Sequence, residues 1–324
     1  MRWLLGLLVL AACQTGQYDL KNWMQDDGKI KVLATVGMIG DLAKEIGGDE
    51  VDVIVLIKGD LDPHTYQLVK GDDEKLFRAD VIFANGLGLE HGPNLNAHLS
   101  SSDKTCFLGS RLKEKYPDDI IRVDGQTDPH IWMDLSLYAK ALPVITEALS
   151  KIRPEKKALF LERQEKLYSE LMKGHETVRS IMQRVPSEKR YLVTSHDAFN
   201  YFAKAYLATS EELQENAWQK RFQAPEGLSP DSQLSQKDIS DIVEHVKKYH
   251  IEVIFPESNV SPDSLKKIRE AAREKGLEIT LGNPYLYADA MGPKGSPGDT
   301  YLKMVISNAK TIAEDLMGET SGQK

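Results

Sequence analysis

One amphipathic stretch in the middle of the chain constrains the fold more than any other feature. It runs between Pro154 and Pro186, and proline suits the first turn of a helix but blocks its continuation. With one polar exception, the residues at the 3.6-residue period are apolar: Phe160, Leu161, Gln164, Leu167, Tyr168, Leu171, Met172, Val178, Ile181 and Met182. About thirty helical residues would extend roughly 45 Å, longer than most globular helices. We therefore predict a connecting helix over residues 153–186 that joins two lobes.

Strand and helix patterns alternate on both sides of this stretch. In the first lobe, the β-branched run "KIKVLATVG" (29–37) precedes the helical pattern "MIGDLAKEIGG" (38–48). In the second lobe, "RYLVTSHDAFNYFAKAYL" (190–207) repeats the design of an apolar strand that turns into a helix. Alternation of this kind predicts a parallel sheet with helices on its faces. We expect an α/β protein with two such lobes, residues 29–152 and 187–324, and a ligand site in the cleft between them, at the carboxyl ends of the strands.

The chain begins with a pattern typical of an export signal. Arg2 precedes ten apolar residues, about half the number needed to span a bilayer core. The ending "LAAC" resembles the bacterial lipoprotein signal, in which the cysteine is acylated and becomes the first mature residue. We therefore expect a signal peptide at residues 1–12, a lipid on Cys13 and a flexible tether over residues 13–28. The protein would then be exported and lipid-anchored to a membrane, on the periplasmic or extracellular face of the cell envelope.

Composition narrows the possible partners. The 324 residues are 41% hydrophobic and 28% charged, with a formal net charge of −8. This balance describes a globular protein, and the negative charge argues against a nucleic-acid partner. If Cys13 is lipidated, Cys106 is the one remaining thiol, so no internal disulfide can form. We expect a monomer that is held together by packing alone.

Histidines on predicted loops supply the first candidates for a functional site. His64 and His130 each follow an Asp-Pro dipeptide, which is stiff because proline fixes its own φ and restricts the residue before it. His196 lies at the end of the strand that opens the second lobe. Three imidazoles from two lobes could converge on one ion in the cleft. The other histidines are either on solvated helical faces or ambiguous: His175, His245, His250, His91 and His98.

A carboxylate from the second lobe would complete such a site. Asp299 precedes an amphipathic pattern and is expected to cap that helix, whereas Asp289 has no local role in its loop. Asp289 is therefore the first choice and Asp299 the alternative. Glu257, at another strand end, is a weaker candidate and could instead support a histidine. The same supporting role is open to four aspartates near the histidines: Asp62, Asp128, Asp134 and Asp197.

Several segments resemble the metal-binding lipoproteins of bacterial ABC importers, the cluster A-I family for manganese, zinc or iron. The segments are "NGLGLE", "DPHIWMD", "TSHDAFNYFAKAY", "PEGLSPDSQLS" and "YADAMGPKGSPGDTYLKM", and together they cover nearly the whole mature chain. In "NGLGLEH" and "RYLVT" the chain resembles the chlamydial member of the family in particular. The resemblance implies that His64, His130, His196 and Asp289 bind the ion. It also implies that the protein is a solute-binding component, not an enzyme, whose partner is a membrane permease with a cytoplasmic ATPase.

The expected donor set restricts the cargo and its chemistry. Three imidazoles and one carboxylate suit a divalent transition metal and disfavour calcium or magnesium. Zinc-dedicated relatives often carry a His/Asp/Glu-rich loop between the first two ligand histidines, and residues 65–129 contain only His91 and His98, with no such tract. We therefore favour manganese or iron, with zinc as the alternative. Two other functions stay open: a secreted metallohydrolase with Asp289 or Glu257 as general base, and a surface adhesin with a structural metal.

Overall fold

The computed structural model describes residues 21–230 and 234–318. The predicted signal peptide and Cys13 lie outside these ranges. Within them, no helix is both long enough and apolar enough to cross a membrane. The last part of the predicted tether is folded against the first lobe: Trp23 is fully buried, and its Nε1 donates a hydrogen bond to the Asp52 carbonyl at 2.9 Å.

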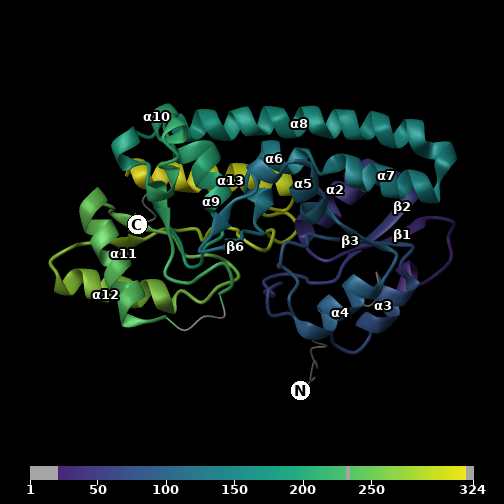
Figure 1. The fold of residues 1–324 in the computed structure, drawn as a ribbon, viewed down its shortest axis with the longest axis horizontal. Helices are drawn as coiled ribbons and strands as arrows, with labels where there is room; N and C mark the ends of the chain where they lie inside the picture. The colour runs from purple at the N-terminus through teal and green to yellow at the C-terminus, as the bar shows by residue number, and fades with distance from the viewer. Residues whose placement is uncertain (1–20, 231–233, 319–324) are drawn as a thin grey trace, which may run out of the picture.

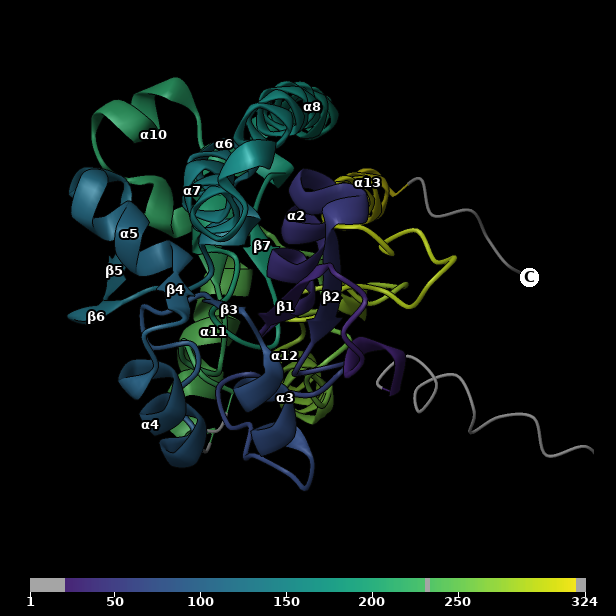
Figure 2. The same cartoon turned by 90° about the vertical axis from the view of Figure 1, so that its right-hand side faces the viewer.

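The first lobe is built on a four-stranded parallel sheet with the strand order β2-β1-β3-β4. Its elements are β1 (Ile30–Ala34), α2 (Gly37–Gly47), β2 (Val51–Val55), α3 (Asp72–Arg78), β3 (Val81–Ala84), α4 (Pro93–Ser101), β4 (Thr105–Phe107), α5 (Leu108–Lys115), β5 (Arg122–Val123), β6 (Gln126–Thr127), α6 (Leu135–Ala139) and α7 (Leu142–Ile152). Helices α2 and α7 cover one face of the sheet, and α3 and α4 lie on the other (Figure 2). Every residue of β1 is buried because both faces are covered.

The second lobe contains shorter parallel strands. Its elements are β7 (Leu192–Val193), α9 (Asn200–Phe202), a π-helix (Ala203–Leu207), α10 (Ser210–Gln214), β8 (Phe222–Gln223), α11 (Gln236–Tyr249), β9 (Val253–Ile254), α12 (Asp263–Glu274), β10 (Thr280–Leu281) and α13 (Tyr301–Met317). Strand β7 pairs with β8, β9 pairs with β10, and a parallel bridge between Thr194 and Phe255 links the two pairs. Helices α11 and α12 pack on this layer through a separate apolar cluster. The predicted α/β architecture of two parallel layers flanked by helices is confirmed.

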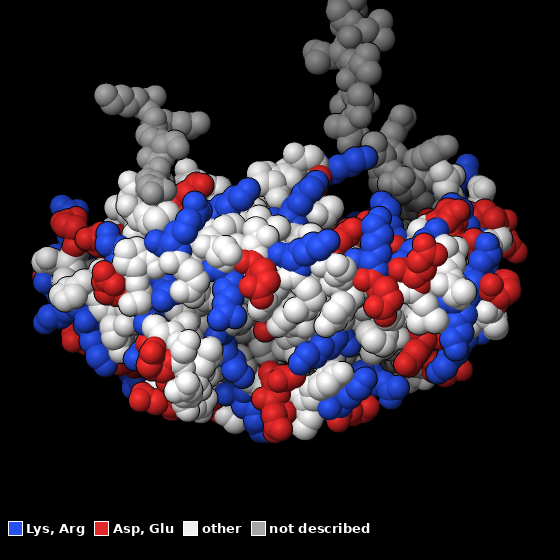
Figure 3. All heavy atoms as spheres, turned by 90° about the horizontal axis from the view of Figure 1, so that it is seen from above, with Lys and Arg blue, Asp and Glu red and all other residues white. Residues whose placement is uncertain are grey.

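The long helix α8 (Lys157–Gln183) runs across both lobes (Figure 1). It is shorter than the predicted range of 153–186, because residues 154–156 form a 3-10 turn and regular helix ends before the proline. Its 27 residues extend about 40 Å. Gly174 lets α13 approach closely, since a Cβ at this position would lie 2.3 Å from Leu302 Cδ1. On the face that carries α8, basic and acidic side chains are interspersed over the surface (Figure 3).

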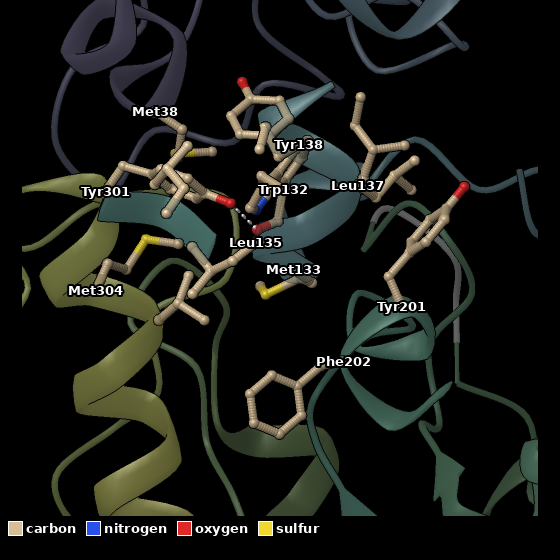
Figure 4. Packing of buried hydrophobic residues seen from close by; sticks show 14 of the residues in the cluster. Met38, Trp132, Met133, Leu135, Leu137, Tyr138, Tyr201, Phe202, Tyr301 and Met304 are labelled. Carbon is tan, nitrogen blue, oxygen red and sulfur yellow. Dashed lines mark hydrogen bonds between the residues drawn. The ribbon is translucent and has the colours of Figure 1, made fainter. Parts of the chain in front are cut away.

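A continuous apolar core connects the two lobes beneath α8. It contains residues from β1 to α13, and Trp132 and Tyr301 are among its fully buried side chains. The Tyr301 hydroxyl donates to the Trp132 carbonyl at 2.6 Å, and Trp132 Nε1 donates to the Ala288 carbonyl at 2.9 Å (Figure 4). These contacts join the segment after His130 to the loop that carries Asp289. The lobes therefore share packing and hydrogen bonds in addition to the connecting helix.

Candidate metal centre

His64 lies on the loop that follows β2. Asp62 fixes the turn, because its carboxylate accepts hydrogen bonds from the His64 backbone N–H at 2.8 Å and from the Thr65 hydroxyl at 2.7 Å. The next loop of the sheet packs directly on this one: a Cβ on Gly92 would lie 2.1 Å from the Tyr66 carbonyl oxygen. His64 is consequently held with only 2% of its surface exposed.

His130 follows β6 and is oriented by the aspartate of its own Asp-Pro-His motif. Asp128 Oδ1 accepts from the His130 backbone N–H at 2.9 Å and lies 2.7 Å from the ring Nδ1. The second carboxylate oxygen of Asp128 accepts from Asn200 Nδ2 at 3.0 Å. Because Asp128 and His130 are both fully buried, this pairing places the ring proton on Nδ1 and leaves Nε2 as the free donor atom.

His196 stands at the carboxyl end of β7, where its backbone bridges to Glu226. Glu257 accepts hydrogen bonds from the His196 backbone N–H, at 3.0 Å, and from the ring Nδ1. Both side chains are fully buried. Glu257 therefore orients a histidine, which was one of the two roles predicted for it, and its carboxylate is engaged with Nδ1 on the side away from Nε2.

The four predicted donors meet at one point. One ligand atom each from His64, His130, His196 and Asp289 lies within 4.8 Å of the other three, and all four residues are buried. The Asp289 carboxylate oxygens lie 3.7, 3.5 and 3.2 Å from the Nε2 atoms of the three histidines, in that order. Asn259 Nδ2 donates to Asp289 Oδ2 at 3.1 Å and fixes the carboxylate.

These donor atoms lack hydrogen-bond partners. The three Nε2 atoms and Asp289 Oδ1 are inaccessible and unpaired among the described residues. Buried polar atoms are rarely left without a partner, because the loss of hydration is not compensated. Metal–nitrogen bonds are about 2.1 Å, so two ligands on one ion lie roughly 3–4 Å apart. The spacing of the four atoms is close to what a single transition-metal ion requires.

Electrostatics differ between the three rings. Burial lowers the pKa of His64 to about 3, so this ring stays neutral. Burial also opposes the charged form of His196, but the carboxylates of Glu257 and Asp289 outweigh it and raise its pKa well above the usual value. Burial would raise the pKa of Asp289, yet the adjacent imidazoles, His196 foremost, hold it well below its usual range. A proton on His196 therefore competes with a cation for the same site.

The remaining candidates have other roles. Asp299 accepts from Gly295 N–H and Lys303 Nζ, and the cap of α13 is Thr300, so the predicted cap was wrong by one residue. Asp134 caps α6 through the backbone N–H groups of residues 136 and 137. Asp197 accepts from Asn200, and burial together with the charge of Asp128 raises its pKa to about 7.

Some residues that hold the proposed ligands in place could not be predicted from the sequence. Asn259, Asn200 and Trp132 hold the aspartates and the Asp289 loop through contacts between distant segments. His91 lies next to the site, with its ring centroid 5.7 Å from that of His64. A cavity of about 990 Å³ runs along β2 and includes Asp289 in its lining. Of the four donor residues, Asp289 lines this cavity and the three histidines do not.

Comparison with known proteins identifies the family. Residues 32–315 match the family described as ZnuA, zinc-uptake complex component A periplasmic. The chain belongs to the ZnuA family. It is 39% identical to the metal-binding protein YtgA of Chlamydia pneumoniae over 89% of this chain and 86% of the relative. It is 28% identical to the manganese ABC transporter substrate-binding lipoprotein PsaA of Streptococcus pneumoniae, over 96% of each chain.

Solved structures agree with this assignment. The crystal structure of Fe(III)-bound YtgA from Chlamydia trachomatis superposes with a TM-score of 0.83 and 36% sequence identity, covering 89% of this chain and 98% of that one. The predicted resemblance to metal-binding solute-binding proteins is thereby confirmed. The metals named differ: the family description specifies zinc uptake, the name of PsaA specifies manganese, and the structure of YtgA from Chlamydia trachomatis is Fe(III)-bound.

Proposed function

We propose that this protein captures one divalent transition-metal ion with His64, His130, His196 and Asp289 and delivers it to the permease of an ABC importer. The observation that carries the proposal is the set of four buried, converging donor atoms without hydrogen-bond partners. Two of the three rings are oriented through Nδ1 by a buried carboxylate, the arrangement that protein metal sites use to direct Nε2 at an ion.

Four protein ligands favour capture over catalysis. A catalytic zinc keeps an open position for water, whereas three imidazoles and a carboxylate able to bind through both oxygens complete the shell. The shared core beneath α8 supports a release mechanism in which the loops around the ion rearrange while the lobes move little. The permease would then take the ion from the rearranged form.

Manganese or iron is the proposed cargo, with zinc as the alternative. Residues 65–129 lack a His/Asp/Glu-rich tract, and the solved structure of YtgA from Chlamydia trachomatis is Fe(III)-bound. Three imidazoles and one carboxylate can bind all three metals. Affinity at such a site generally follows the Irving–Williams order, so the donor set alone does not select the cargo. Metal analysis of the protein purified from its native host tests this part of the proposal.

Membrane attachment completes the proposed function. Cys13 would carry the lipid, as expected from the "LAAC" ending, and PsaA is named as a lipoprotein. A lipid-tethered protein stays near the permease without a spanning helix. Labelling with a radioactive fatty acid should mark the wild type and leave Cys13→Ser unlabelled; labelling of the variant would refute the assignment of the anchor.

The binding experiment is a calorimetric titration of metal-free protein with Mn²⁺, Fe²⁺ and Zn²⁺. We expect one site per chain and a loss of about 100-fold or more in affinity for His196→Ala, because one ligand of four disappears. His98→Ala is the matched control, since His98 is half exposed and lies beside Asp73 on the surface. Normal binding by His196→Ala, or no binding by the wild type, would refute the proposed function.

A further inference from the structure

A second cavity lies under the C-terminal half of α8. Its volume is about 640 Å³, and α6, the π-helix and the start of α10 contribute to its lining. None of the four proposed metal ligands lines it. This volume is within the range of small-molecule sites, and π-helical segments occur frequently at functional sites.

The lining contains both paired and unpaired charges. Lys140 Nζ is 2.6 Å from Asp119, and Asp134 caps α6 and lies 3.3 Å from His175 Nδ1. The third lining acid is Glu211, which Thr209 engages by a side-chain hydrogen bond. Three lining cations have no carboxylate within ion-pair distance in the described part of the chain: Arg179, Arg190 and Lys204.

Arg190 is the most unusual of these cations because only 5% of its surface is exposed. Its Nε and Nη1 atoms are buried and have no hydrogen-bond partner among the described residues. Two carboxylates act on Arg190 from beyond ion-pair distance, Glu212 and Glu188. Glu212 already pairs with Arg221 Nε at 2.7 Å and with Lys220 Nζ at 2.9 Å. Burial and the charge of Arg221 lower the pKa of Arg190. Burial of guanidinium N–H groups without hydrogen-bond partners is unfavourable, and no carboxylate of the described residues forms an ion pair with Arg190.

We propose that this cavity binds a small polyanion, a metabolite with several carboxylate or phosphate groups, that pairs with Arg190, Arg179 and Lys204. Guanidinium groups bind oxyanions through two parallel hydrogen bonds, and the cavity is larger than a single phosphate requires. The cations come from separate segments: Arg179 from α8, Lys204 from the π-helix, and Arg190 from the segment before β7. A bound anion would bridge these segments.

The proposal is tested by calorimetry on the metal-free protein with two probes, inorganic phosphate and tricarballylate, at an ionic strength held constant with sodium chloride. We expect saturable one-to-one binding of at least one probe. Tighter phosphate binding would assign a phosphorylated ligand, and tighter tricarballylate binding a polycarboxylate. Neither probe depends on the metal ligands, so failure here is distinguishable from failure of the proposed metal site.

Variants assign the binding to this cavity. Arg190→Met should weaken it by about tenfold or more, and Arg179→Gln and Lys204→Gln by about threefold or more, because each removes a charged hydrogen bond. Lys166→Gln is the matched control: it is on α8 as well, is 79% exposed and does not line the cavity. Circular dichroism checks that the Arg190 variant is folded. Absence of saturable binding, or wild-type binding by both Arg179→Gln and Lys204→Gln, would overturn the proposal.

Discussion

Replacement of Glu257 by glutamine should change both the strength of metal binding and the number of protons that binding releases. Glu257 is fully buried and accepts hydrogen bonds from the backbone and the ring Nδ1 of His196. Glutamine keeps the shape of this contact but removes the charge. Loss of a carboxylate that orients a metal-binding histidine typically weakens binding by about 10- to 100-fold.

The proton count follows from the pKa of His196. Although burial lowers it, the charges of Glu257 and Asp289 raise this pKa well above the usual 6.5, so the ring carries a proton at neutral pH in the metal-free protein. An incoming ion must displace that proton, and the apparent affinity falls about tenfold for each pH unit below the raised pKa. In Glu257→Gln, one of the two carboxylates that raise this pKa loses its charge, so the pKa of His196 falls and metal binding releases fewer protons at pH 7.

The difference in metal affinity between the wild type and Glu257→Gln should depend on pH. Above the raised pKa of His196 the variant should bind about 10- to 100-fold more weakly than the wild type. As the pH falls, proton competition lowers the affinity of the wild type more than that of the variant, so the difference in affinity between them narrows. A difference in affinity that narrows as the pH falls distinguishes proton competition at His196 from simple damage to the site, which would lower the affinity of the variant equally at every pH.

The assay is calorimetric titration with zinc in two buffers of different ionisation enthalpy, from which the released protons are counted. Glu226→Gln is the matched control, because the Glu226 backbone pairs with His196 but its carboxylate makes none of the ring's hydrogen bonds. Equal proton release by wild type and Glu257→Gln at pH 7 would refute the reasoning.

Three further predictions concern the elements that hold the site. Gly92→Ala should lower the free energy of unfolding in urea by about 1–3 kcal/mol and weaken metal binding, because the new Cβ would lie 2.1 Å from the Tyr66 carbonyl oxygen. Gly37→Ala is the control and should change neither, because its Cβ would lie 3.5 Å from the nearest atom. Trp132→Phe should cost about 1–3 kcal/mol, since a buried carbonyl loses its donor; an unchanged unfolding midpoint would contradict this. Burial lowers the pKa of His245 to about 4, so as the pH falls this residue takes up a proton in the unfolded chain before it does so in the folded protein. The free energy of unfolding should therefore fall by about 3 kcal/mol between pH about 6.5 and about 4, and His245→Gln should remove this contribution.

Stiff local motifs explain why two of the proposed ligand positions can be predicted from the sequence. In each Asp-Pro-His motif, the aspartate accepts the hydrogen bond of the histidine backbone two residues later, so the conformation of the loop is set locally. Asp289 was selected because it lacked a local role, and the family resemblance supported the choice. The structure places it against all three imidazoles.

Other features depend on tertiary contacts that local patterns do not encode. Two such contacts join residues far apart in the sequence: Asn259 and Asp289, 30 residues apart, and Trp132 and Ala288, 156 residues apart. The sequence around these residues contains no motif that predicts either contact. Helix ends were predicted less accurately for the same reason. Pro154 and Pro186 mark the predicted limits of the long helix, but regular helix begins at Lys157 and ends at Gln183. Both Asp299 and Thr300 are chemically suited to cap α13.

The central claim is that one transition-metal ion is surrounded by three imidazoles and one carboxylate. X-ray absorption spectroscopy at the metal edge of the loaded protein measures this shell directly. We predict scattering from three imidazole rings at about 2.1 Å together with carboxylate oxygen, and the loss of one ring in His196→Ala. A shell with fewer than three imidazoles in the wild type, or an unchanged shell in the variant, would contradict the account.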